Sequence, residues 1–414
     1  MKKEIFIVWL MVNCLIFLGA RVMAQEKEGR IHVGNLKIIP GITFQGVYDD
    51  NIYLSNGSND DDGGEESDWI THVTPSILFD FAFLGRGHLK LGYQGDLAYY
   101  AEKDENDWQN HRGIFGLNYE APGGLIVDID NTYVNAEDPY GSENEYKLGV
   151  PQVSRWSNGL KTKIGHAFSD KFKVLGFYNY YTQDYDSRVD FTQDYDVNEF
   201  GIGFQMRLLP KTWGFIRYHY GERDYFTHPA GTGVTESNDS DFKWHRVNTG
   251  LTWDSGAKLS GELNFGYQWK DYDNLTDVNG RRYDDKDTWI ASTFMSFEAT
   301  ATTTLDFSVV RALRETGSDT NEFFEDTGIG INLRQLIFTK AQLYAGATYS
   351  RNDYNLSEGE PRKDDNYKAN IGIYYLIRGW MRVGVGYDYW KKNSDRSEYE
   401  FTDNRFTASL SIVY

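Results

Sequence analysis

The strongest constraint on the fold of this chain is an alternation of apolar and polar residues with a period of two. Between Leu89 and Tyr99 the odd positions are apolar, aromatic or Gly, and the even positions are mostly polar or charged. The same alternation runs from Leu259 to Lys270. Successive side chains of a β-strand point to opposite faces of the sheet. The pattern therefore predicts strands with one apolar and one polar face, and helical periodicity is absent after residue 24.

The connections between these segments alternate between short and long. Short turns are predicted around residues 85–87, 122–124, 169–171, 209–211, 254–256, 300–302, 338–339 and 378–379. Long polar connections are predicted at 49–68, 102–109, 135–153, 184–195, 225–240, 272–285, 316–321, 353–364 and 392–400. The repeating unit is a hairpin of about 40 residues. Eight short turns and nine long connections join about 18 strands, with a range of about 16–20.

The aromatic content favours a membrane barrel over a soluble domain. The chain has 11 Trp, 30 Tyr and 25 Phe, yet after residue 24 no apolar run approaches the ~18 residues of a spanning helix. A β-propeller would fit four short strands into each period, whereas two strands of ten or more residues fit here, as tilted membrane strands require. We predict an all-β fold, a transmembrane antiparallel up-and-down β-barrel over residues 35–414. The net charge of −19 argues against nucleic acid as a partner.

The two ends of the chain carry export and assembly signals. Residues 1–24 have a basic start, an apolar run and a small-residue cleavage site, as in a secretory signal peptide. Residues 25–34 are then a short periplasmic lead, and both termini fall on the short-turn side, which is periplasmic in an outer-membrane barrel. The alternating segment Phe406–Tyr414 is similar to the final-strand signal read by the barrel assembly machinery. That machinery and outer-membrane lipid are the expected partners.

Two expectations concern the lipid-facing side. Aromatic residues near strand ends are expected to form the interfacial girdles of a barrel, and they include Trp69, Tyr99, Tyr133, Trp269, Tyr349 and Tyr389. The alternation around Val309 and Val310 places Arg311 toward lipid unless a β-bulge intervenes.

The first predicted hairpin resembles a known family. Residues 47–54 read VYDDNIYL, and residues 69–77 read WITHVTPSI. The first segment is similar to the E-x-Y-x-D-N-[IV]-x-L opening of the putative beta-barrel porin 2 family, and the second is similar to the P-S-[IL] step of its second strand. Val47 stands where an acidic residue is common. The resemblance implies an outer-membrane barrel that accompanies exopolysaccharide export and acts as a pore for polymer, together with periplasmic polysaccharide-export components.

The acidic stretch from Tyr48 to Trp69 is a candidate cation site. An EF-hand loop needs a bidentate carboxylate at its twelfth position. Aligning Gly63 to the sixth position places Trp69 there, so the motif fails. No specific metal site or cofactor is predicted. Two readings remain open: a solvated loop without a ligand, or weak surface contacts with divalent cations at Asp60, Asp61, Asp62, Glu65 and Glu66.

The alternation also assigns residues to the lumen. The charged candidates are Lys90, Asp96, Asp128, Asp130, Lys163, Arg207, Arg217, Arg246, Glu262, Arg334, Arg382 and Asp388. They either pair across strands or set the field that a solute meets in the pore. Tyr100, Phe177, Tyr374 and Trp390 are aromatic candidates for stacking on sugar rings, although a register slip of one residue would move them outward. By analogy with porins, the third long connection, 135–153, is a candidate to fold inward.

The predicted function is a passive outer-membrane channel that passes exopolysaccharide or other sugars through a polar lumen. The alternative is a non-conducting barrel whose acidic surface connections form a binding or adhesion surface. A hydrolase is the third reading, because His111, His228 and His245 fall near the outer rim. No local motif brings a nucleophile, a base and an orienting group together, so no catalytic residue is predicted.

Overall fold

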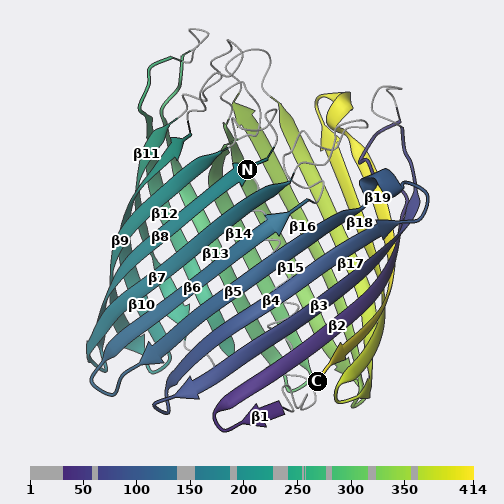
Figure 1. Ribbon diagram of the computed structural model, residues 1–414. Helices are drawn as coiled ribbons and strands as arrows, with labels where there is room; N and C mark the ends of the chain where they lie inside the picture. The colour runs from purple at the N-terminus through teal and green to yellow at the C-terminus, as the bar shows by residue number, and fades with distance from the viewer. Residues whose placement is uncertain are drawn as a thin grey trace.

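The computed structural model describes residues 31–57, 64–137, 154–186, 194–226, 241–253, 256, 258–276, 282–315, 323–355 and 362–414. These residues form a closed β-barrel of 18 antiparallel strands, preceded by one short extra strand (Figure 1). In the described part of the chain no helix is both long and apolar enough to cross a membrane. The predicted all-β barrel of about 18 strands is confirmed.

The strands are β1 (Ile31–Val33), β2 (Leu36–Asp49), β3 (Asp68–Phe83), β4 (Gly87–Tyr100), β5 (Trp108–Glu120), β6 (Leu125–Ala136), β7 (Arg155–Ser169), β8 (Phe172–Tyr185), β9 (Tyr195–Leu209), β10 (Thr212–Tyr225), β11 (Phe242–Trp253), β12 (Leu259–Tyr272), β13 (Lys286–Thr300), β14 (Thr303–Glu315), β15 (Phe323–Ile337), β16 (Ala341–Asn355), β17 (Lys363–Arg378), β18 (Met381–Ser394) and β19 (Phe401–Val413). Two short 3-10 helices, η3 (Asp104–Asn106) and η5 (Ser397–Tyr399), lie in long connections.

The barrel closes where the last strand pairs with the first long one. Each strand from β2 to β19 pairs with the next, and β19 pairs with β2 from Arg405↔Asp49 to Val413↔Gly41. β1 folds back on the start of β2, where Val33 pairs with Leu36. Closure leaves no free sheet edge in the spanning wall, so the backbone groups of the wall are satisfied in lipid.

All eight predicted short turns join strands at one end of the barrel, here called the short-turn end, and the long connections lie at the other, the long-loop end (Figure 1). β1 and the C-terminus lie at the short-turn end. Most of the third long connection, residues 138–153, lies outside the described residues, and so do residues 1–30.

The two faces of the wall differ as the alternation predicts. On β9 and β10 the exposed apolar residues include Ile202 and Ile216, 60% and 54% exposed, and their alternate neighbours Gln205 and Phe215 are buried. Exposed apolar side chains mark the outer, lipid-facing side. The girdle candidates Trp69, Tyr99, Tyr133 and Trp269 are all exposed on this side.

Charge is sorted along the barrel axis. The strands contain 25 acidic and 25 basic residues, so the wall has no net charge. The nine long connections contain 31 acidic and 7 basic residues, whereas the eight short turns contain 2 acidic and 5 basic ones. The net negative charge of the chain is therefore carried, by sequence, by the long connections.

Candidate functional site: the inner face of the barrel

The inner face of β4 to β7 carries a row of charged side chains. Register places Lys90, Gly116, Asp130 and Lys161 side by side across four strands. Gly116 has no side chain, so nothing separates Lys90 from Asp130 on this row. One step toward the short-turn end, Lys163 of β7 pairs with Asp128 of β6. This part of the wall is polar and accessible, because Asp130 and Lys161 are exposed.

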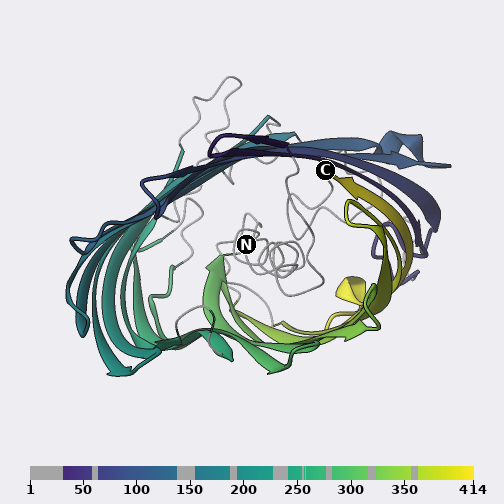
Figure 2. The same cartoon turned by 90° about the horizontal axis from the view of Figure 1, so that it is seen from below.

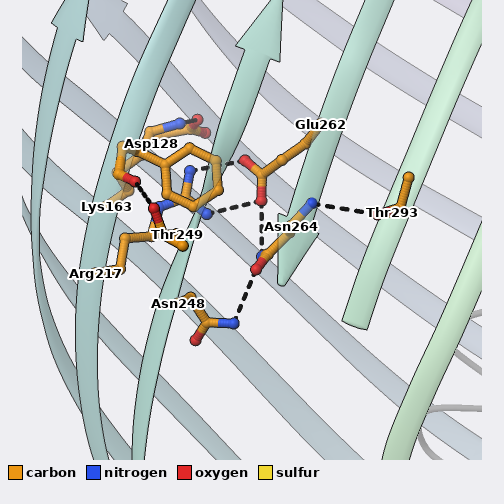
Figure 3. Close-up of polar contacts among 9 residues, drawn as sticks. Asp128, Lys163, Arg217, Asn248, Thr249, Glu262, Asn264 and Thr293 are labelled. Atoms are coloured by element: carbon orange, nitrogen blue, oxygen red, sulfur yellow. Dashed lines mark hydrogen bonds and ion pairs between the residues drawn. The ribbon is translucent and has the colours of Figure 1, made fainter. Parts of the chain in front are cut away.

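A second network crosses β10 to β13. Arg217 donates two parallel hydrogen bonds to Glu262, at 2.8 and 2.7 Å. Asn264 donates to Glu262 at 3.0 Å, and Asn248 donates to Asn264 at 2.8 Å. Figure 3 shows this chain of contacts, with Lys163 and Asp128 drawn in the same view. A bidentate arginine–carboxylate pair fixes both side chains, so this stretch of the inner face is rigid.

The other charged candidates have defined neighbours. Asp96 contacts His72 and Thr74, and Arg334 pairs with Asp306 at 2.8 Å. Arg246 lies 3.7 Å from Glu199 and donates to Gln268.

The remaining basic candidates contact aromatic rings. Arg207 and Lys173 both lie over the ring of Trp213, and Arg382 lies 5.3 Å from the ring of Tyr374. Asp388 is exposed. Of the twelve, Asp128 and Lys163, and Arg217 and Glu262, are brought together as direct pairs.

Aromatic rings accompany these charges. Phe177 lies beside Arg217 and His219, with its ring 5.4 Å from the imidazole. Tyr374 stacks on Tyr344 with ring centroids 5.0 Å apart. The four aromatic candidates are neither buried nor fully exposed, so each has a surface that a solute could touch: Tyr100, Phe177, Tyr374 and Trp390. Lys368 covers one face of Trp390 at 3.7 Å.

The wall folds inward at the long-loop end of β14 and β15, and the sequence alone did not predict this. β13 and β14 pair from Thr300↔Thr303 only as far as Ala291↔Arg311. Beyond that point β14 pairs with β15 alone, as far as Glu315↔Phe323. The two strands separate there, and Figure 2 shows the green part of the wall bent toward the barrel axis.

Contacts across the fold show which surfaces meet. Lys270, on the inner face of β12, forms an ion pair with Glu315, and both side chains are buried, at 1% and 8% exposure. Tyr272 donates a hydrogen bond to Glu315 at 3.2 Å, and Lys270 lies 5.2 Å from the ring of Phe323. By alternation, Glu315 and Phe323 belong to the same face as the exposed Ile331. One face of β14 and β15 thus meets lipid near the short-turn end and the inner side of β11 and β12 near the long-loop end.

This inward fold corrects the expectation for Arg311. The β13–β14 ladder shows a register shift only between Glu298 and Thr300. Arg311 therefore keeps the outward position, but it lies at the point where the strands part. It donates to Thr327 at 2.7 Å, pairs with Glu325 and lies against the ring of Trp289. Glu325 also pairs with Lys286, so one carboxylate serves two cations. The Arg311 side chain is 15% exposed and has both an ionic and an aromatic partner, so it does not face lipid unpartnered.

Hydrogen bonds hold the start of the first long connection in an ordered conformation. Asn51 is 1% exposed. Its side-chain NH2 group donates to the backbone carbonyls of Ser55 and Thr402, and its side-chain oxygen accepts from the backbone N–H of Ser55. Ile52 packs with Val47 and Trp108 in a small core. The residues of the family opening therefore bind the first connection to the barrel wall.

The acidic residues that follow have two different outcomes. Asp60, Asp61 and Asp62 lie outside the described residues. Glu66 forms an ion pair with Lys103 in the next long connection, and this hydrogen bond raises the pKa of Lys103. Glu65 is exposed. The weak cation contacts predicted for this stretch stay a prediction.

Two of the three rim histidines, His111 and His245, lie on the outer side of the wall. His111 forms a hydrogen bond with Tyr93, and His245 forms one with Tyr218. Both tyrosines are exposed. The third histidine, His228, lies outside the described residues.

A closed barrel with a lipid-facing apolar surface and a polar inner face defines a transmembrane β-barrel of the outer-membrane type. The chain belongs to the putative beta-barrel porin 2 family, whose model matches residues 27–414. The family resemblance inferred from the first hairpin is confirmed, and the protein is an outer-membrane barrel of porin type.

Several solved structures are similar to this chain at low sequence identity. The FrpB iron transporter from Neisseria meningitidis matches with a TM-score of 0.51 and 8% identity, over 91% of this chain and 81% of that one. OccK2 (OpdF) from Pseudomonas aeruginosa matches with a TM-score of 0.48 and 9% identity, over 91% and 98%. A structure titled bacterial polysaccharide outer membrane secretin matches with a TM-score of 0.35 and 7% identity, over 92% and 100%. No individually curated protein matches the sequence.

Proposed function

We propose that this barrel is a passive channel that passes exopolysaccharide or other sugars across the outer membrane. The observation that carries the proposal is the chemistry of the inner face of β4 to β8 and β16 to β18. It combines amide, carboxylate and ammonium groups with the accessible rings of Phe177, Tyr374 and Trp390. Polar groups exchange hydrogen bonds with sugar hydroxyls, and aromatic faces pack on the apolar faces of sugar rings. No chemical step is involved, and no cofactor or catalytic residue has a role.

The balance of charge in the strands supports the same substrate class. With 25 acidic and 25 basic residues, the wall has no net charge to concentrate small ions of one sign. Many of these charges are held in ion pairs, for example Arg217 with Glu262. A polymer of neutral or weakly charged sugars would slide past paired charges more easily than past unpaired ones, because no strong single ion pair has to be broken at each step.

The orientation completes the proposal. The long-loop end faces the cell surface, and both termini face the periplasm, where polysaccharide-export components would deliver the polymer. The acidic long connections then surround the exit. Labelling single cysteines at Ser397 and Lys340 in intact cells tests this, because only the surface residue should react with an impermeant reagent; the reverse pattern contradicts the orientation.

Planar-bilayer recording of the purified, folded protein tests transport. We expect steady current in KCl and transient blockade when a soluble oligosaccharide is added on either side. Phe177→Ala should shorten the blockades, because one stacking ring is lost. Phe265→Ala, which removes an exposed ring on the outer side of β12, is the matched control and should leave them unchanged. Blockades that do not respond to Phe177→Ala would exclude that ring from the sugar path.

A second candidate is a non-conducting barrel whose long-loop end is a binding or adhesion surface. Two observations favour it: the 31 acidic residues of the long connections, and the inward fold of β14 and β15, which occupies part of the lumen. Absence of current from folded protein, both intact and after the long connections are trimmed, would reject the channel and leave this candidate.

A further inference from the structure

The seam between β2 and β19 gathers three carboxylates at the long-loop end. Asp49 and Asp50 end β2 and begin the first connection, and Asp403 lies on β19. One ligand oxygen from each lies within 4.8 Å of the others, a spacing that one metal ion can bridge. Asp49 and Asp403 are buried, at 3% and 1% exposure, and Asp50 is partly exposed.

The positive charge at this place does not match the negative charge. Arg405 contacts Asp49 through Nε at 3.0 Å and Asp403 Oδ2 through Nη2 at 2.8 Å, so one guanidinium serves two carboxylates. Asp50 accepts hydrogen bonds from the amide and the side chain of Asn404, both at 2.7 Å. Of the other cations nearby, Lys392 pairs with Asp364, and Lys368 lies over the ring of Trp390 and attracts Asp403 only at longer range.

One oxygen of the cluster has no donor. Asp403 Oδ1 is buried, and none of the described residues donates a hydrogen bond to it. A buried carboxylate oxygen without a partner is costly, because desolvation is not repaid. This orphaned oxygen, in a residue that is almost fully buried among two other carboxylates, indicates a missing cation.

We propose that Asp49, Asp50 and Asp403 bind a calcium ion at the closing seam of the barrel. Carboxylates are preferred ligands of calcium, which tolerates irregular geometry and fills its remaining positions with water. Magnesium needs a regular octahedron at shorter distances, which three carboxylates from two strands do not offer. The ion joins the first long strand to the last one. Its role is separate from transport, and a non-conducting barrel would bind it equally.

Terbium luminescence on the folded, full mature chain in detergent tests the site. Trp390 is the cross-strand partner of Asp403, so bound terbium should be sensitised by this ring. The acidic long connections also attract terbium, and Trp390→Phe, which keeps all three carboxylates, separates their signal from that of the seam. Calcium should displace the Trp390-dependent signal at lower concentration than magnesium; equal displacement would overturn the assignment to calcium.

Two variants and a control complete the test. Asp403→Asn should abolish the Trp390-dependent signal and the rise in the urea unfolding midpoint that calcium gives relative to EDTA. Asp50→Asn, at the more exposed ligand, should weaken binding about tenfold or more, because affinity follows the number of charged ligands. Asp365→Asn, a carboxylate paired with Arg351 on the outer side of the wall, should change neither.

The opposing explanation is that Asp403 and Asp49 share a proton and bind no metal. In that case the wild type shows no calcium response in either measurement, and this result would overturn the proposal. If Asp403→Asn does not fold, the comparison of Asp50→Asn with Asp365→Asn decides the question by the same two measurements.

Discussion

Replacing Lys270 by Met should release the inward fold of β14 and β15. Lys270 and Glu315 are the buried ion pair that joins β12 to this fold, at 1% and 8% exposure. Removing the lysine leaves Glu315 with the neutral donor Tyr272 and with only the longer-range attraction of Arg223. Breaking a buried pair by removing one partner costs about 3–5 kcal/mol. Because every ~1.4 kcal/mol is tenfold in an equilibrium constant, the population with the fold released should rise about 10²–10³-fold.

The release is expected to be local. The end of β14 has no ladder to β13 beyond Ala291↔Arg311, so the fold can open without breaking the barrel wall. Local opening generally costs less than global unfolding. Planar-bilayer recording should therefore show larger or more frequent conducting states in Lys270→Met. Hydrogen exchange should show loss of protection at residues 312–315 and 323–325, with β4 to β8 unchanged.

Two further variants make the reasoning refutable. The double variant Lys270→Met/Glu315→Leu removes both charges, and replacing a buried pair by apolar residues is often neutral or stabilising by about 1–4 kcal/mol. Its conductance and its hydrogen exchange at the ends of β14 and β15 should return to wild-type values. Lys243→Met breaks an exposed pair with Asp273 at 2.9 Å, worth about 0–1 kcal/mol, and should change nothing. If Lys270→Met lowers global stability while conductance and local exchange stay at wild-type values, the inward fold is not an independent unit.

Three other outcomes are expected. Arg217→Ala leaves Glu262 without its bidentate partner and gives the balanced wall one net negative charge. The reversal potential in a KCl gradient should therefore shift toward cation selectivity. The control Arg351→Ala, on the outer side, should leave the reversal potential unchanged. Asn51→Ala removes buried hydrogen bonds to Ser55 and Thr402 and should cost about 1–3 kcal/mol of unfolding free energy, measured in urea; a shift below a few tenths would contradict a structural role. Ile331→Arg, at an outer position that is 51% exposed, should cost about 2–4 kcal/mol in lipid, whereas Gln94→Arg on the inner face should be tolerated, and equal costs would mean that the two faces are misassigned.

The wall of this barrel could be predicted from the sequence because each strand reports its own two faces. Phe265, Tyr267 and Trp269 alternate with polar residues whatever their neighbours are, and the short turns at Gly85 and Pro210 mark where the chain reverses. Pairing between consecutive strands then follows from the short connections. These signals are local, and they predicted about 18 strands and which residues of each strand share a face.

The inward fold could not be predicted in the same way. Lys270, Glu315 and Phe323 meet because β13 and β14 part, and parting of two strands leaves no signal in the period of either one. Arg311 was the only local sign, since a guanidinium at an outward position needs a partner. The seam is equally non-local: Asp50 and Asn404 are 354 residues apart, and neither residue type identifies the other.

That distance gives the seam a consequence for assembly. The outer edge of β2 stays without a strand partner over most of its length until β19 has been made, because only β19 covers it. An incomplete barrel therefore exposes an open edge, which is a template for wrong pairing, together with the uncompensated carboxylates of Asp49 and Asp50. The final strand covers this edge and brings Arg405 to Asp49 and Asn404 to Asp50. A chain that lacks its last hairpin, β18 and β19, would therefore differ from the complete barrel in the charge at one point of its rim.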